Sequence, residues 1–182
     1  MIILEGHRQM AEVGFARFSA REVAKRIGYS IGTIYNVFGT HDRLILAINT
    51  RTFVLWADHL RKRLDSSGED RIRTLVEGYF SFARQCPNLW MAIYDHRLPP
   101  DAAMPPEFDA ERSELTAIVT EEVAAALPVA ARVDAPRLAR SLIATVHGHC
   151  TFALNGSFSL MGESDPEALA LARIRESLAA AA

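Results

Sequence analysis

The sequence predicts an all-α protein, with an N-terminal three-helix head and a larger C-terminal helical bundle. Apolar residues recur at helical spacing along most of the 182 residues, whereas the alternation typical of strands is absent. Ala, Leu, Glu and Arg, which favour helices, dominate the periodic segments. With 49% hydrophobic and 23% charged residues, the chain has enough apolar side chains for a packed core. We expect residues 1–45 to form the head and residues 46–182 the body.

In the head, local signals mark where each helix starts and stops. Ser19 and Glu22 form a capping box: the Ser19 hydroxyl accepts a hydrogen bond from the Glu22 backbone N–H, and the Glu22 carboxylate accepts one from the Ser19 N–H. Gly28 ends the helix that this box begins. Thr40 or His41 caps the long helix that follows. The three head helices expected cover residues 2–13, 19–27 and 31–38, and the long helix expected over residues 42–64 leads from the head into the body.

In the body, prolines and glycines interrupt the helical pattern. Residues 98–106 hold four of the eight prolines and cannot be helical throughout, so we expect an exposed connection there. Gly156 suits a left-handed C-cap. The body helices expected cover residues 69–84, 88–97, 107–126, 134–155 and a last stretch from residue 164 into the alanine-rich tail.

The two short helices of the head predict a helix-turn-helix, because only Gly28, Tyr29 and Ser30 separate them. The apolar residues expected to hold the pair together and to the helix behind it are Val23, Ala24, Ile27, Ile34, Val37 and Phe38. The opposite face of the second helix is compact, hydrogen-bonding and free of negative charge, and consists of Ser30, Gly32, Thr33, Tyr35 and Asn36. Such a face can reach the phosphates and base edges of a duplex. Gly32 has two open interpretations: close backbone approach to a phosphate, or the low cost of glycine near a helix N-terminus.

The formal net charge of −2 hides an asymmetry along the chain. Residues 1–63 contain ten basic and five acidic residues, a net charge of +5, so the remaining residues carry −7. A basic head on an acidic body favours contact between the head and a polyanion. Charge scattered over a solvated surface is the alternative interpretation.

Together these residues resemble the DNA-binding domain of TetR-type repressors. The resemblance covers Gly14-Phe15, residues 19–27, the Ser-x-Gly-Thr-x-Tyr-x-x-Phe run from Ser30 to Phe38, and residues 42–44. The family commonly carries basic residues before its first helix, whereas this chain starts inside that helix, which leaves a longer native N-terminus open.

The resemblance implies roles for the head residues. Thr33, Tyr35 and Asn36 would face operator DNA, with the Tyr35 hydroxyl on a phosphate. The family usually has a lysine where this chain has His41. Because histidine is mostly neutral near pH 7, that phosphate contact should be weaker or pH-sensitive. The expected DNA-binding residues are Arg17, Ser19, Arg21, Ser30, Gly32, Thr33, Tyr35, Asn36 and His41.

The resemblance further implies a body that binds a small ligand, whose binding changes the spacing of two DNA-binding heads. An aromatic-rich region predicts a pocket for a mostly apolar ligand. Plain core packing is the alternative for each of its aromatic residues. The pocket residues expected are Trp56, Phe80, Trp90, Tyr94 and His147.

The helix over residues 134–155 contains Val146-His147-Gly148, which resembles the Trp-His-Gly motif of one C-terminal subtype of the family. Gly148 would let two helix backbones approach closely. Because His147 and His149 are two residues apart on a helix and point apart, we expect no metal site and no cofactor.

The last two helices carry apolar stripes that predict a homodimer interface, as the resemblance also implies. A twofold dimer suits the two half-sites of a palindromic operator. The stripe residues are Leu138, Leu142, Val146, Cys150 and Ala153 on one helix, and Leu171, Ile174 and Leu178 on the other.

Several function classes are disfavoured by the sequence. No nucleophile–base–acid set, phosphate loop or carboxylate pair occurs at a spacing suited to catalysis, so we expect that the protein is not an enzyme. No apolar run approaches the roughly 20 residues of a membrane span, and the start is not a signal peptide. Together with two cysteines that lack CxxC spacing, these absences favour a cytoplasmic protein. The alternatives to a ligand-responsive repressor are a DNA-binding regulator without an inducer, or a helical metal-binding protein or enzyme.

Overall fold

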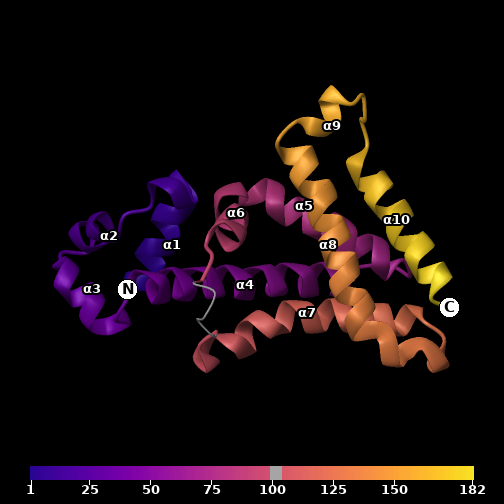
Figure 1. The fold of residues 1–182 in the computed structure, drawn as a ribbon, viewed down its shortest axis with the longest axis horizontal. Helices are drawn as coiled ribbons and strands as arrows, with labels where there is room; N and C mark the ends of the chain where they lie inside the picture. The colour runs from indigo at the N-terminus through magenta and orange to yellow at the C-terminus, as the bar shows by residue number, and fades with distance from the viewer. Residues whose placement is uncertain (99–103) are drawn as a thin grey trace. The chain divides into compact units, whose positions relative to one another are not determined.

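A computed structural model describes residues 1–98 and 104–182 of the chain. Within these ranges there are helices and no strand, which confirms the all-α fold class (Figure 1). Residues 99–103, the middle of the expected proline-rich connection, lie outside the described residues. The elements are α1 (Ile2–Val13), η1 (Phe15–Arg17), α2 (Ala20–Arg26), α3 (Ile31–Phe38), α4 (His41–Asp65), α5 (Arg71–Gln85), α6 (Pro87–Asp95), α7 (Pro106–Ala126), η2 (Val129–Asp134), α8 (Ala135–Leu154), α9 (Ser157–Leu160) and α10 (Pro166–Ala180).

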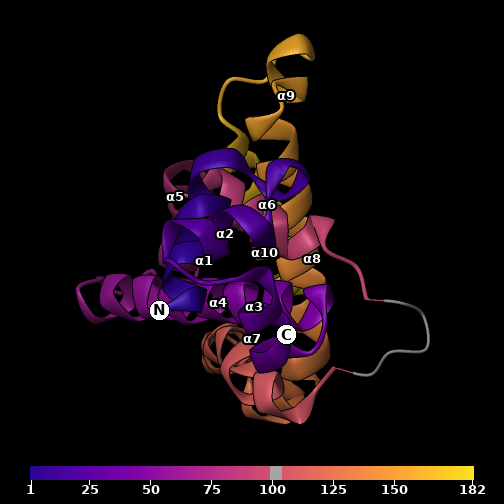
Figure 2. The same cartoon turned by 90° about the vertical axis from the view of Figure 1, so that its left-hand side faces the viewer.

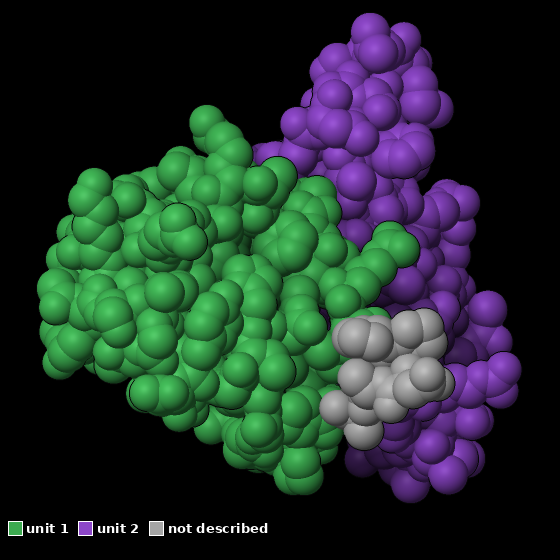
Figure 3. All heavy atoms as spheres, turned by 60° about the vertical axis from the view of Figure 1, so that its left-hand side comes forward, with its two compact units in different colours: residues 1–56, 86–113 green, residues 57–85, 114–182 purple. Residues whose placement is uncertain are grey.

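The described chain forms two compact units, coloured separately in Figure 3. Unit 1 consists of Met1–Trp56 and Cys86–Ser113, and unit 2 of Ala57–Gln85 and Glu114–Ala182. The predicted division after residue 45 stays a prediction, since compactness alone does not delimit a DNA-binding domain.

In unit 1, α1, α2 and α3 gather around one apolar core (Figure 2). Val23, Ala24 and Ile34 are buried there, as expected, and Ile27 and Phe38 are half-buried. Val37 is 63% exposed, so its prediction as a packing residue was wrong. The buried core residues are Met10, Ala20, Val23, Ala24, Ile34, Leu44, Ile45, Ile48, Leu89 and Ala92.

In unit 2, α8 and α10 pack against each other and against α5. The central residues of both predicted dimer stripes are therefore used inside the chain. Among them, Leu142, Val146 and Cys150 on α8 and Leu171 and Ile174 on α10 are at most 6% exposed. These five residues are not available to a partner, and their assignment to a dimer interface was wrong.

Gly148, by contrast, faces outward from α8. Gly148 is exposed, and apart from its chain neighbours and the backbone of its own helix, no atom of the described residues lies within 4 Å of where a Cβ would stand. The expected close approach of a second helix at Gly148 therefore does not occur within the chain.

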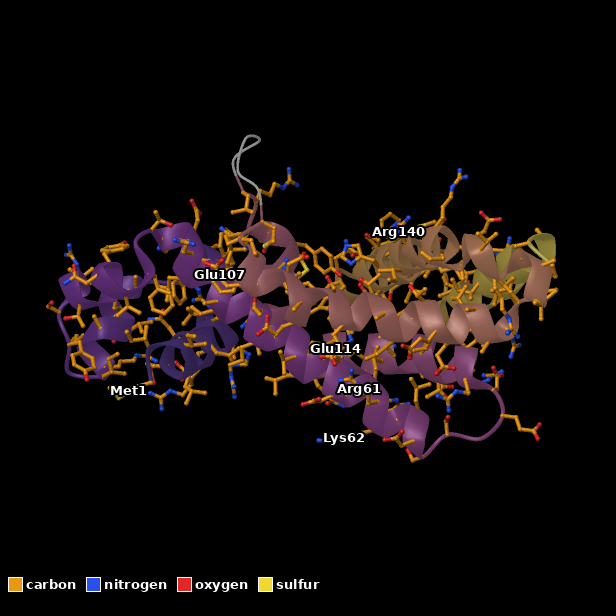
Figure 4. All side chains as sticks on the ribbon, turned by 90° about the horizontal axis from the view of Figure 1, so that it is seen from below. Met1, Arg61, Lys62, Glu107, Glu114 and Arg140 are labelled. Carbon is orange, nitrogen blue, oxygen red and sulfur yellow. The ribbon has the colours of Figure 1, made fainter. Side chains whose placement is uncertain are left out.

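Ion pairs connect α4 and α5 to α7 in unit 2. Arg61 near the end of α4 pairs with Glu114 on α7, and their side chains point toward each other in Figure 4. Arg71 makes two hydrogen bonds of 2.6 Å to the carboxylate of Glu122. None of the helices in the described ranges is both long and apolar enough to cross a membrane.

Candidate nucleic-acid interface

The start of α2 is fixed by α1 as well as by its own cap. The Ser19 hydroxyl accepts a hydrogen bond from the Glu22 N–H at 3.3 Å, as the capping box predicts. The reciprocal hydrogen bond of the capping box, from the Ser19 N–H to the Glu22 carboxylate, was predicted wrongly. The Ser19 N–H donates instead to the Gln9 side-chain oxygen at 3.0 Å, and the Glu22 carboxylate accepts from Arg26. Gln9 is only 2% exposed, so this bond satisfies a buried amide and links α1 to α2.

The turn between α2 and α3 is a Schellman motif that leads directly into a capped helix. Gly28 has φ +75°, and its N–H donates to the Lys25 carbonyl. The Tyr29 N–H donates to the Ala24 carbonyl at 2.9 Å, which closes the motif. The next residue, Ser30, is the N-cap of α3. Four residues, 27–30, therefore connect α2 to α3.

The outward face of α3 holds the residues predicted to meet DNA. Gly32, Tyr35 and Asn36 are exposed, and Thr33 is half-buried. The Ser30 hydroxyl accepts from the Thr33 N–H at 3.2 Å, and the two side-chain oxygens lie 3.1 Å apart. Ser30 therefore orders the start of α3, and Thr33 has a hydroxyl held in place.

Gly32 is not required by the chain itself. A Cβ there would meet only the Ser30 oxygen, at 3.5 Å, which is an ordinary contact. The fold therefore leaves both interpretations of Gly32 open, and close approach to a phosphate stays a prediction.

Much of the positive charge of the head is neutralised within the head. Arg26 pairs with Glu12 at 2.7 Å, Glu22 at 3.2 Å and Glu5 at 3.4 Å. These hydrogen bonds, that of Glu12 foremost, raise the pKa of Arg26. Arg8 pairs with Glu5 at 2.7 Å. Neither arginine leaves an uncompensated cation for DNA.

The cations left over are Arg17, Arg21 and Lys25. All three are exposed, and none has a carboxylate partner among the described residues. Arg17 donates from Nε to the Val13 carbonyl at 3.2 Å, which orients its side chain. Sequence reasoning missed Lys25, although its i, i+4 spacing from Arg21 on α2 places the two on one face.

The start of α4 carries the last predicted DNA contact. The Thr40 hydroxyl accepts from the Arg43 N–H at 3.1 Å, so Thr40 rather than His41 caps the helix. His41 is exposed, and its ring lies 6.0 Å from that of Phe18. Its side chain is accessible to a phosphate.

The residues predicted to line a ligand pocket are divided between the units. Trp56, Trp90 and Tyr94 belong to unit 1, and Phe80 and His147 to unit 2. Both tryptophans and Phe80 are at most 1% exposed. The Trp90 and Tyr94 rings meet edge-on, with centroids 5.5 Å apart.

An apolar cavity of about 40 Å³ lies within unit 2, and none of these five residues lines it. Tyr79 does line it, and its hydroxyl is 3.0 Å from Nδ1 of His147. Burial lowers the pKa of His147, which keeps the imidazole neutral. The lining residues are Leu60, Ile72, Leu75, Val76, Tyr79, Val119, Val123, Leu142, Ile143, Val146 and Ile174.

Comparisons with known proteins agree with this architecture. Residues 2–48 match the family described as bacterial regulatory proteins, tetR family. Residues 72–176 match the tetracyclin repressor-like, C-terminal domain. No curated protein gives a significant match.

Several solved structures share the fold over nearly the whole chain. A protein assigned a regulatory role, SCO4313, is 24% identical with a TM-score of 0.71, covering 98% of this chain and 93% of its own. A protein of unknown function from Rhodococcus sp. RHA1 is 19% identical with a TM-score of 0.74, covering 98% and 92%. The multidrug binding protein EbrR, solved with imidazole, is 21% identical with a TM-score of 0.60, covering 97% and 92%.

Proposed function

Because the chain belongs to the TetR family of DNA-binding transcriptional regulators, we propose that it is a repressor that binds a palindromic operator as a homodimer and releases it when a small ligand binds. The proposal that the chain binds DNA is supported mainly by the outward face of α3. Tyr35 and Asn36 are exposed there, on a helix without a charged residue. An asparagine amide can pair with the edge of adenine, and a phenol can donate to a phosphate.

The unpaired cations of the head supply the sequence-independent part of binding. Arg17, Arg21 and Lys25 are exposed and near α3 in sequence, and each can neutralise a phosphate. Each such contact releases counterions from the duplex. We therefore expect operator affinity to fall steeply with salt.

Ligand responsiveness is supported by the apolar cavity of unit 2. At about 40 Å³ it has room for a few water-sized groups only, far below the roughly 300–1,000 Å³ of sites for drug-sized ligands. A ligand there would have to enlarge the cavity, and this requirement couples binding to conformation. The multidrug binding protein EbrR shares this fold.

The same small volume also favours the alternative, a DNA-binding regulator without an inducer. The two proposals differ in one observable. An inducer both raises the melting temperature of the free protein and dissociates the operator complex, whereas without an inducer neither change occurs in any ligand screen.

The homodimer is supported by the outer face of α8. From Ser141 to Gly162 the chain has no charged residue, and Phe152 and Leu160 in this stretch are 45% and 91% exposed. Gly148 lies on the same helix with open space beside it. A second copy of the chain would cover this surface.

The DNA assignment is tested by replacing Tyr35 and Asn36 together with alanine. The operator is first selected from random duplexes with the wild-type chain. The double variant should then lose at least about 30-fold in operator affinity in a gel-shift assay, the effect of losing about 2 kcal/mol, since a good base contact alone contributes about 1–3 kcal/mol. It should remain folded and dimeric.

A matched control replaces Val129 and Val133, which are 78% and 81% exposed on η2 in unit 2, with alanine. Its operator affinity should equal that of the wild type. Unchanged affinity in the Tyr35/Asn36 variant would show that α3 is not the recognition helix.

A further inference from the structure

Val37 is an apolar side chain on the outside of a helix whose apolar residues otherwise point inward. It is 63% exposed, whereas Ile34 on the same helix is fully buried. Valine is also a weaker helix former than most residues, because its branched Cβ restricts χ1. Neither packing nor helix propensity therefore accounts for valine at this position.

Val37 shares its face of α3 with the residues proposed to meet DNA. Counting from Thr33, Asn36 and Val37 are at i+3 and i+4, which places each of them beside Thr33 on the helix surface. Tyr29 and Tyr35 are 47% and 39% exposed in the same short stretch. An isolated exposed valine would need no explanation, but here three large exposed side chains occur within nine residues of sequence.

The chemistry of the side chain limits what it can recognise. An isopropyl group neither donates nor accepts a hydrogen bond, so it gains nothing from a phosphate or from most base edges. The apolar group displayed in the major groove is the C5 methyl of thymine. Asn36, one residue away, has the amide that pairs with adenine.

We propose that Val37 is a specificity-determining residue that packs against a thymine C5 methyl in each operator half-site. This inference rests on the proposed DNA-binding function. It adds that Val37 selects thymine at one position of each half-site. It also predicts an A·T pair at or next to the base pair that Asn36 contacts.

The test removes the methyl group from the DNA. With the full chain and its selected operator, each thymidine of a half-site is replaced in turn by deoxyuridine. At one position this replacement should weaken wild-type binding about fourfold, the effect of exposing one buried methyl group. Val37→Ala should bind the thymidine operator several-fold more weakly than the wild type does. It should bind the deoxyuridine operator as tightly as it binds the thymidine operator.

Two further variants make the result specific. Val37→Thr keeps one γ-methyl and should retain part of the sensitivity to deoxyuridine. Val129→Ala, at another exposed valine, should keep all of it. Because Val37 is exposed, its replacement should leave the melting temperature unchanged.

The proposal and the function on which it rests fail differently. If the operator is bound and no thymidine position distinguishes wild type from Val37→Ala, the methyl contact is wrong and the DNA-binding function stands. If selection yields no preferred duplex, both are wrong.

Discussion

At the scale of single residues, His7 shows how an internal position sets a dependence on pH. His7 lies on α1, and its Nε2 is buried without a hydrogen-bond partner among the described residues. Burial, and secondarily the positive charge of Arg51, lower the pKa of His7 to about 4. The folded chain therefore keeps this imidazole neutral well below the ordinary histidine pKa of about 6.5.

This shift predicts a loss of stability in mild acid. Between pH 6.5 and pH 4 the unfolded chain binds a proton at His7 that the folded chain does not, so the free energy of unfolding falls as pH falls through this window. After allowing for partial solvent screening, His7 should account for about 1 kcal/mol of the loss between pH 7 and pH 5. His7→Gln should reduce the slope accordingly in urea unfolding at the two pH values.

Part of the slope should persist in His7→Gln, because burial also lowers the pKa values of His59 and His147. The control Arg137→Gln, an exposed position on α8, should keep the full slope. Identical slopes for His7→Gln and the wild type would exclude His7 as a source.

In the helix-turn-helix, a cap was predicted correctly from the sequence, whereas the side to which one apolar residue points was not. Ser19 was predicted as a cap from a local pattern, because a cap depends on neighbours in sequence. The roles of Ser30 and Tyr35 at DNA stay predictions. Val37 was misplaced, because an apolar residue on an eight-residue helix can belong to either face. Which side is buried depends on α1, α2 and α4, whose residues share the apolar core with Ile34.

At the scale of elements, Gly14 determines how α1 leads into η1. It has φ +74° and ψ 172°, a backbone region that essentially only glycine occupies. A Cβ there would also lie 3.3 Å from the side-chain oxygen of Asn88. Asn88 in turn donates to the Ala11 carbonyl at 2.8 Å, so the turn is braced from α6.

Gly14→Ala should therefore lower the free energy of unfolding by about 1–3 kcal/mol, the usual cost of a residue in such a region. Chemical denaturation with circular dichroism measures the loss. Gly68→Ala, at a loop glycine with nothing within 4 Å of an added Cβ and no positive φ, should be close to neutral. Equal stability of the two variants would show that the turn at Gly14 rearranges freely.

The helices that the sequence predicted best are those with chemical signals at their ends. The range of α3, from Ser30 as N-cap to Gly39 after its last turn, follows from local hydrogen bonding. By contrast, η1, η2 and α9 were not expected, because three to six residues are too few to display a period. The apolar stripe of α8 was recognised, but its partner was not, because the sequence alone does not show that α5 and α10, rather than a second chain, cover this face.

At the scale of the whole molecule, the outer face of α8 remains the best support for assembly. Glycine inside a helix costs roughly 1 kcal/mol relative to alanine. At Gly148 the chain itself gives no reason for that cost, because no atom crowds the position and its φ is not positive. A backbone from a second copy, approaching closely at this point, would supply the reason.

Gly148→Glu should therefore have opposite effects on folding and on assembly. The side chain has open space and glutamate favours helix, so the free energy of unfolding of the monomer should not fall. In a dimer, the same carboxylate would be buried against the partner, so light scattering should report a monomer. Operator affinity should drop by about 100-fold or more, because the two heads no longer bind as one unit.

The control Ala125→Glu, at an exposed position on α7, should remain dimeric and bind the operator as tightly as the wild type. If Gly148→Glu sediments as a dimer at the same concentration as the wild type, the partner lies elsewhere, and the uncharged surface from Ser141 to Gly162 has another occupant.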